Sequence, residues 1–160
     1  MSSIEDLRFL FASYGVRPSQ LAKLVDIARR SRQSMDRELF IRYLERQVAR
    51  GIIAPRIASV LRELFNKTEL NEALRILSLA ILSYEFEFIK PIVENLDKIE
   101  KEIKAKIFYV KVSFPPTPKF FVKVELHLDR NLSQSTLIQT ILKYYPSDIK
   151  KFMKISLSPS

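Results

Sequence analysis

The sequence predicts an α+β fold, in which an N-terminal helical bundle is followed by a small C-terminal β-β-α-β unit. Two observations predict it. Over residues 1–104, apolar side chains recur every three or four positions, as they do in helices with one buried face. From Ile107 the spacing changes to two, which is typical of strands that bury alternate side chains. This change of period predicts an Arg-rich helical domain over residues 1–104 and a Lys-rich domain over residues 105–160.

Glycine and proline divide the helical part. Gly15 and Gly51 each follow an amphipathic stretch, where glycine commonly supplies the left-handed residue just past a helix end. Pro18 and Pro55 suit the first turn of a helix, because the amide that proline lacks has no partner there. The predicted helices run over residues 4–14, from 18 to a break at 31–34, from that break to 50, from 55, from a cap at 66 to about 83, and from 91.

The C-terminal part contains two alternating stretches around a proline-rich connection. Residues 107–114 and 119–128 alternate, and they flank the segment 115–118, which reads Pro-Pro-Thr-Pro. This pattern predicts a hairpin with a stiff connection whose prolines donate no backbone hydrogen bonds. Residues 133–145 then predict a helix, and residues 151–157 a last short strand.

The charge of the chain predicts a polyanionic partner. The 160 residues carry a net charge of +9 and an isoelectric point near 9.8, which favours nucleic acid or another anionic surface. The alternative is a basic surface that only keeps the protein soluble. The longest apolar run, Ile76–Leu82, is too short to cross a bilayer, and the N-terminus shows no secretion signal. We therefore expect a cytoplasmic protein without a membrane partner.

Arginine and lysine are segregated along the chain. Twelve of the thirteen arginines precede residue 76, and twelve of the fourteen lysines follow it. Nine arginines and no lysine lie between Arg29 and Arg62 inclusive. Arginine forms forked contacts with phosphate and stacks on bases. A cluster of this composition therefore predicts a surface that binds a polyanion.

The third predicted helix carries three of these arginines at a spacing of four, on the face opposite Phe40 and Leu44. Three more arginines stand at the predicted break before it. Two short helices with a basic second helix resemble a helix-turn-helix, whose second helix enters the major groove. The alternative is an exposed face with salt bridges to Glu38 and Glu45. The arginines of this predicted phosphate-contacting surface are Arg29, Arg30, Arg32, Arg42, Arg46 and Arg50.

The predicted strands repeat one pattern on one side of the sheet. If one alternate set of residues faces the core, each strand presents an aromatic residue and, two positions later, a lysine on the other side. Such a face suits single-stranded nucleic acid, because bases stack on the rings while ammonium groups hold phosphates. The alternative is a sheet face partly covered by the rest of the protein. The three pairs are Tyr109 and Lys111, Phe121 and Lys123, and Phe152 and Lys154.

A possible protein-binding surface is predicted just before the strands. Four apolar residues recur at the spacing of a short coiled-coil stripe, and three aromatic residues precede them. Aromatic residues are favoured in the cores of interfaces. We expect either that this stripe packs on the protein's own bundle or that it binds a protein partner or a second copy. The residues are Tyr84, Phe86, Phe88, Ile92, Leu96, Ile99 and Ile103.

The sequence lacks familiar catalytic and metal-binding patterns. Its two isolated glycines exclude a glycine-rich phosphate loop, and the absence of cysteine, with His127 as the single histidine, excludes a Cys/His zinc site within one chain. Glu102 with Lys104, and Asp129, match only part of a metal-dependent nuclease site. We therefore predict a non-enzymatic nucleic-acid-binding protein without metal or cofactor. The alternative is an accessory subunit of a larger assembly.

Overall fold

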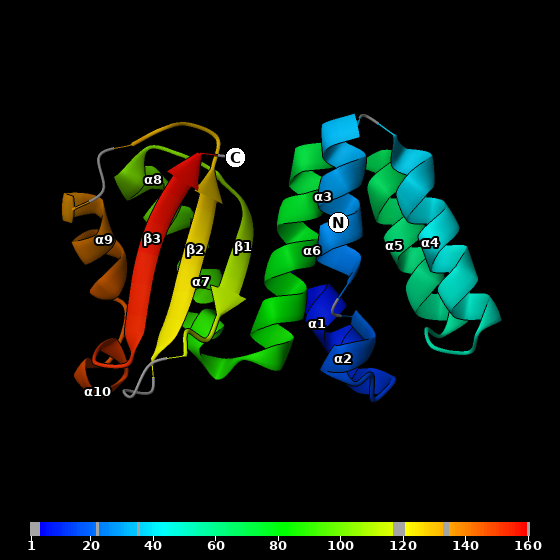
Figure 1. Cartoon of the computed structure of the whole chain (residues 1–160), viewed down its shortest axis with the longest axis horizontal. Coiled ribbons are helices and arrows are strands. Elements are labelled where there is room, and N and C mark those ends of the chain that lie inside the picture. Colours follow the sequence, from blue (N-terminus) through cyan, green and yellow to red (C-terminus); the bar gives the residue numbers. More distant parts are fainter. Residues whose placement is uncertain (1–3, 22, 35, 117–120, 133–134, 160) are drawn as a thin grey trace. The chain divides into compact units, whose positions relative to one another are not determined.

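A computed structural model describes residues 4–21, 23–34, 36–116, 121–132 and 135–159; the side chains of residues 32–34, 135 and 136 lie outside that description. The chain forms two compact units, Met1–Glu85 and Phe86–Ser160 (Figure 1). The first unit contains helices and the second contains the strands, which confirms the α+β fold. The division falls after Glu85, whereas the change of period placed it after residue 104.

The first unit packs around α6. This helix is buried on most sides, as its apolar composition predicted, and it contacts α1, α2, α3 and α5. Phe40 of α4 packs on Phe65 of α5 with ring centroids 4.2 Å apart. The described helices of this unit are α1 (Ile4–Ser13), α2 (Pro18–Leu21), α3 (Leu24–Ser34), α4 (Arg37–Ala49), α5 (Pro55–Lys67) and α6 (Leu70–Glu85).

The predicted break at residues 31–34 is wrong, because α3 continues through this segment. Ser31 is fully buried, and its hydroxyl donates to the carbonyl of Ile27 at 3.0 Å. A serine that bonds the preceding turn satisfies its hydroxyl inside the helix, so it does not end the helix. α4 begins instead after Asp36, whose carboxylate accepts the amide of Glu38 at 3.0 Å and caps the helix.

The two glycines end helices as predicted. Gly15 has a φ of +58° and Gly51 a φ of +71°, the left-handed conformation that glycine adopts without a Cβ clash.

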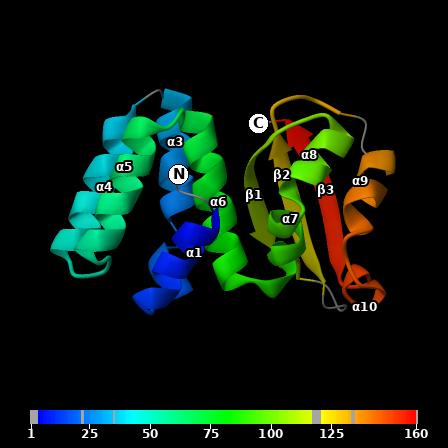
Figure 2. The same cartoon turned by 180° about the vertical axis from the view of Figure 1, so that it is seen from behind.

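Between these turns, α3 and α4 lie side by side and run in opposite directions (Figures 1 and 2). They form an antiparallel helical hairpin, whereas the helices of a helix-turn-helix cross steeply.

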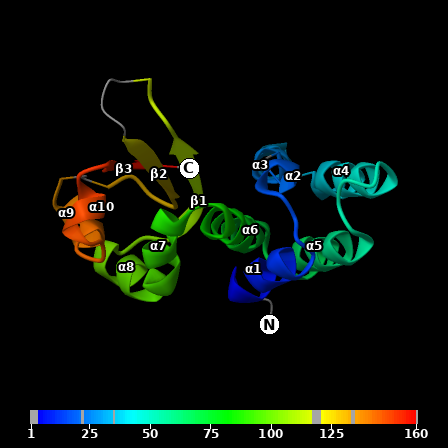
Figure 3. The same cartoon turned by 90° about the horizontal axis from the view of Figure 1, so that it is seen from below.

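The second unit is a three-stranded sheet with helices on one face (Figure 3). Its strand order is β1-β2-β3; β1 and β2 are antiparallel, and β2 and β3 are parallel. α9 and α10 connect the parallel strands, which cannot be joined by a tight turn. The described elements are the 3₁₀ helix η1 (Glu87–Ile89), α7 (Lys90–Glu94), α8 (Leu96–Ile103), β1 (Ile107–Ser113), β2 (Val122–Leu128), α9 (Ser135–Leu142), α10 (Ser147–Lys150) and β3 (Met153–Pro159).

The apolar stripe of α7 and α8 explains why these helices belong to the second unit. Ile92 and Ile99 are fully buried, and Leu96 and Ile103 are nearly so. The stripe that resembled a coiled-coil seam therefore lies in the core of the second unit, whereas it was expected to pack on the N-terminal helical bundle or to bind a partner. A partner cannot bind these four side chains without displacing that core.

The three aromatic residues before the stripe are also engaged within their own units. The hydroxyl of Tyr84 donates to the carbonyl of Val16, inside the first unit. In the second unit, the ring of Phe86 stacks on Phe88 at a centroid distance of 5.0 Å and lies 5.6 Å from Phe114. All three side chains are half-buried by these contacts.

The register of β1 departs from simple alternation. Ile107 pairs with Leu128 and Tyr109 with His127, so a bulge lies between them. An extra residue in one strand shifts which side chains face the core. Ile107 is fully buried as a result, and Phe108, which follows it at the bulge, is half-buried.

Candidate functional site

The sheet of the second unit has an apolar face and a polar face. Buried residues such as Val110, Leu126 and Leu157 alternate along the strands with polar residues, and the helices lie on one side of the sheet (Figure 3). The alternate positions form what we call the polar sheet face. It comprises Tyr109, Lys111, Ser113, Phe121, Lys123, Glu125, His127, Phe152, Lys154, Ser156 and Ser158.

The strand register arranges this face in four rows, which we name by their chemistry. The residues of a row are register partners, except in the first row, whose two residues directly precede β2 and β3. There, the amide of Val122 donates to the carbonyl of Phe152 at 2.7 Å. The rows are the aromatic row (Phe121, Phe152), the cation row (Ser113, Lys123, Lys154), the acid row (Lys111, Glu125, Ser156) and the ring row (Tyr109, His127, Ser158).

The aromatic and cation rows form the more exposed end of the face. Phe152 is 56% exposed and Phe121 is half-buried. Lys123 and Lys154 are register partners, and like charges directly opposite each other destabilise a sheet unless an anion lies between them. Lys154 is exposed and has no ion pair within the described residues. Two of the three predicted aromatic–lysine pairs therefore lie side by side.

The acid row contains Glu125, the one carboxylate on this face within the described strands. Its two oxygens lie 3.3 Å from Lys123 Nζ and 3.3 Å from His127 Nε2. Burial raises the pKa of Glu125, but the bonds from Lys123 and His127 together lower that pKa below its ordinary value. Glu125 is therefore a charged acceptor at neutral pH, with the exposed Lys111 as its partner on β1.

The ring row differs from the expectation for the first aromatic–lysine pair. Tyr109 is only 5% exposed, and its ring stacks on the His127 imidazole with centroids 4.2 Å apart and planes at 10°. A ring in this position offers a base little surface for stacking. Of this pair, only Lys111 presents its side chain to solvent.

The arginines expected on the third helix lie along α4, and all three are exposed. Arg42 lies 3.5 Å from Glu38 in a largely exposed pair. Arg46 stands in the last turn and Arg50 at the C-cap, and neither has an ion pair within the described residues. The negative end of the helix dipole favours cations at these positions, which gives them a structural role independent of any ligand.

The other three arginines belong to α3 and not to a break. Arg29 lies 3.4 Å from Asp26, and its side chain is 25% exposed. Arg30 is exposed, and the side chain of Arg32 lies outside the described residues. The salt bridge between Arg42 and Glu38 matches the alternative of an ordinary charged face, and the pair of Arg29 with Asp26 was not part of that prediction.

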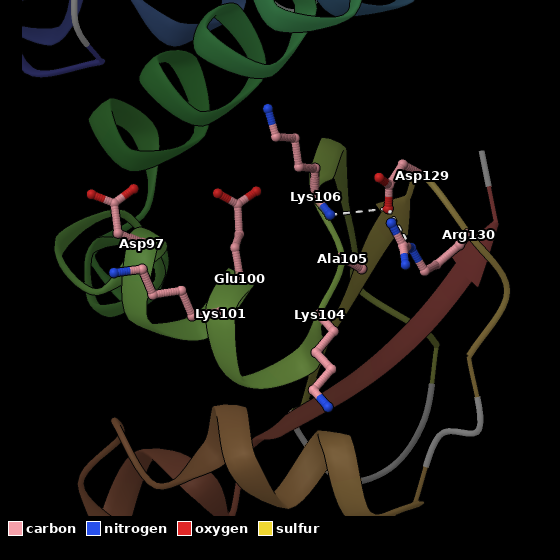
Figure 4. A pocket seen from close by; sticks show the side chains of 8 residues that line it. All are labelled: Asp97, Glu100, Lys101, Lys104, Ala105, Lys106, Asp129 and Arg130. Carbon is pink, nitrogen blue, oxygen red and sulfur yellow. Dashed lines mark hydrogen bonds and ion pairs between the residues drawn. The ribbon is translucent and has the colours of Figure 1, made fainter.

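An open pocket of about 400 Å³ lies where α8, the start of β1 and the end of β2 meet (Figure 4). Two of its carboxylates accept hydrogen bonds from backbone amides. Glu100 accepts one from Ile107 at 2.8 Å, and Asp129 accepts one from Lys106 at 3.0 Å. The side chains of Lys104 and Lys106 point in opposite directions, so the cations around the pocket do not converge on one point. The lining residues are Asp97, Glu100, Lys101, Lys104, Ala105, Lys106, Asp129 and Arg130.

The carboxylates considered for a nuclease site have other partners. Glu102 accepts hydrogen bonds from Lys143 Nζ at 2.6 Å and from the hydroxyl of Tyr144 at 2.7 Å, which joins α8 to the turn that follows α9. Within the described residues, no group of three or more His, Cys, Asp or Glu side chains could hold a metal ion. None of the helices in the described part of the chain has the length and apolar character needed to span a membrane.

No known protein family, curated protein or solved structure matches this chain. Its candidate site is therefore interpreted from its own geometry. The sequence did indicate which residues face outward, but it did not reveal that Lys123 and Lys154 are neighbours. A helix between two strands allows them to be parallel, but it does not determine that they are neighbours in the sheet. Glu125 was not among the predicted site residues, and its oxygens lie 3.3 Å from Lys123 Nζ and 3.3 Å from His127 Nε2.

Proposed function

We propose that this chain is a non-enzymatic nucleic-acid-binding protein that holds a single strand on the polar sheet face. The arginines of α3 and α4 serve as a second, phosphate-contacting surface. The observation that carries the proposal is the parallel register of β2 and β3, which sets Phe121 beside Phe152 and Lys123 beside Lys154. This arrangement supports stacking of bases on the aromatic row while the adjacent cation row binds phosphate.

The physical basis is the combination of stacking and charge at the spacing of a sheet. Neighbouring strands lie about 4.8 Å apart, so the two lysines can engage one phosphate or two successive phosphates. Stacking on an aromatic side chain contributes roughly 1–3 kcal/mol per base and tolerates any sequence. Base faces are open to such contacts in single strands, whereas in a duplex they are already stacked on each other.

The arginine surface supports the proposal in a different way. Arg46 and Arg50 are exposed cations, and phosphate contacts by such residues add affinity without reading sequence. Because α3 and α4 form a hairpin, we do not assign α4 the role of a recognition helix. Duplex binding is therefore expected to be the weaker mode.

The first test is the substitution Phe152→Ala, measured by fluorescence anisotropy with labelled single-stranded DNA, RNA and duplex DNA of equal length at low salt. Loss of one stacking contact should weaken binding of single strands by about tenfold and change duplex binding little. Phe152 is more than half exposed, so its removal should leave the fold intact. Circular dichroism would check that.

Phe9→Ala is the matched control, because Phe9 is a 75% exposed phenylalanine on α1, in the other unit. Equal losses in the two variants would argue against a specific stacking surface on the sheet. If the folded wild-type protein bound none of the three nucleic acids even at low salt, the proposal would fail. The accessory-subunit alternative would then be the better hypothesis.

A further inference from the structure

We propose that Glu125 makes the polar sheet face selective for guanine within a single strand. This inference rests on the function proposed above and adds the base that the site prefers. Its starting point is a carboxylate in the middle of a face that otherwise carries lysine, serine and aromatic side chains. On a surface that binds phosphate, a carboxylate repels the backbone of the ligand, so the part of the ligand that suits it is a hydrogen-bond donor on a base.

The chemistry of the bases distinguishes guanine from the others. Guanine presents an imino N–H and an amino group side by side, and two carboxylate oxygens can accept both. Cytosine and adenine each present one amino group. Thymine and uracil present a single N–H between two carbonyl oxygens, which a carboxylate repels. A fixed carboxylate therefore favours guanine most and thymine or uracil least.

The surroundings of Glu125 complement the rest of the same base edge. Lys123 Nζ lies 3.3 Å from the carboxylate, and Lys111 is the register partner of Glu125 on β1. These ammonium groups can donate to the carbonyl oxygen of guanine, which lies next to its imino group. A carboxylate offers about four acceptor positions, so the contacts to Lys123 and His127 leave capacity for a base.

The position of Glu125 along the strand also fits this role. Glu125 lies on β2 and Phe121 directly precedes that β-strand, with Lys123 between them on the same face of the sheet. A strand that stacks one base on the aromatic row and passes its phosphate over the cation row brings a later base to the acid row. The Glu125 side chain is 28% exposed, so it is open in part to solvent while the lysine and histidine hold its carboxylate in place.

Glu125 also has a structural explanation, namely that it offsets the repulsion between Lys123 and Lys154. The two roles differ in what they do to affinity. A carboxylate that only neutralises lysine lowers affinity for every oligonucleotide by the same factor. A carboxylate that accepts hydrogen bonds from guanine changes the ratio between oligonucleotides.

The test compares ten-residue oligothymidine with the same oligonucleotide carrying one central guanine, cytosine or adenine, for wild type and Glu125→Gln. In the wild type, one guanine should raise affinity about tenfold, and cytosine or adenine by less. Glu125→Gln should reduce the guanine preference to below about twofold, while oligothymidine binds as well as before or better because a negative charge is gone. Glu94→Gln, an exposed acid on α7, is the charge-matched control.

The outcomes separate this inference from the function on which it rests. A guanine preference that persists in Glu125→Gln overturns the inference, and so does a wild type without any preference. If in either case Phe152→Ala still weakens oligothymidine binding, the proposed function stands without the base preference. If the folded protein binds none of the oligonucleotides, both proposals fail.

Discussion

The carboxylate of Asp129 connects the end of β2 to the start of β1 in the second unit. It follows β2 and accepts the amide of Lys106, the residue before β1, at 3.0 Å. The guanidinium Nε of Arg130 lies 3.4 Å away. Burial raises the pKa of Asp129, but the Lys106 amide and Arg130 together lower that pKa below its ordinary value. The folded state therefore stabilises the charged carboxylate of Asp129 relative to the protonated carboxyl group.

The variant Asp129→Asn should make stability less dependent on pH in acid. A carboxyl whose pKa is lowered by folding contributes stability above its unfolded pKa and loses it as the pH falls through its folded pKa. From about pH 5 to about pH 3, the free energy of unfolding should fall more in the wild type than in the variant. Urea unfolding at both pH values measures this. Asp148→Asn in α10 is the control, and equal pH dependence of wild type and Asp129→Asn would contradict the assignment.

At the scale of elements, the end of α8 is unusual because its left-handed residue is not glycine. Lys104 has a φ of 56° at the C-cap, and its amide donates to the carbonyl of Glu100. This conformation brings Cβ close to the next carbonyl oxygen, at a cost of roughly 1 kcal/mol for a residue other than glycine. Gly15 and Gly51 avoid that cost at the ends of α1 and α4.

We expect Lys104→Gly to stabilise the protein by about 0.5–1 kcal/mol, because glycine removes the Cβ crowding at this C-cap. The control is Lys98→Gly inside the same helix, which should lower stability by about 1 kcal/mol through the helix propensity of glycine. Urea unfolding of both variants measures whether each substitution raises or lowers the free energy of unfolding. A loss of stability in both would show that the left-handed lysine carries no appreciable strain.

On the scale of the whole molecule, the two compact units carry different cations. Every arginine except Arg130 lies in the first unit, and twelve of the fourteen lysines lie in the second. Arginine and lysine hold phosphate in different ways, the first through a planar fork and the second as a point charge. The net charge of +9 attracts a polyanion to either unit, so the salt dependence of binding reports which cations contact phosphate.

The double variant Lys123→Ala/Lys154→Ala should lower the slope of log affinity against log salt by up to about 1.4, since each phosphate contact on a single strand contributes about 0.7. Lys98→Ala/Lys101→Ala on α8 removes the same charge away from the polar sheet face and should change the slope less. Anisotropy titrations at several salt concentrations measure both. Equal slopes in the two double variants would count against phosphate contact at the cation row.

The arginine surface is tested in the same assay by Arg42→Ala/Arg46→Ala/Arg50→Ala. A lower slope in this variant would support phosphate contact by α4, and an unchanged slope in a folded variant would exclude α4 from the contact surface. This variant is needed because the helix dipole of α4 already explains why cations occupy positions 46 and 50, without any ligand.

The sequence by itself determined what depends on neighbouring residues along the chain. Helical spacing, the two glycines and the change of period were sufficient for the α+β fold and for most helix ends, because capping and alternation are local effects. The same alternation correctly assigned Lys111, Lys123 and Lys154 to the outer face. Local signals misplaced the helix break near Ser31, because a buried hydroxyl can bond the preceding turn of its own helix. They also misplaced the cap at residue 66: Asn66 lies inside α5, and at the start of α6 the carboxylate of Glu69 accepts the amide of Glu72 at 3.1 Å.

Only the tertiary structure decided how distant segments combine. The bulge in β1 leaves Ile107 buried and Phe108 half-buried, and the ring of Tyr109 stacks on the imidazole of His127 in the neighbouring strand. Packing assigned α7 and α8 to the second unit, because a helix joins the core that buries its apolar stripe. The parallel pairing that sets Lys123 beside Lys154 links residues about thirty positions apart, and the register of hydrogen bonds between strands, rather than any local preference, places them together.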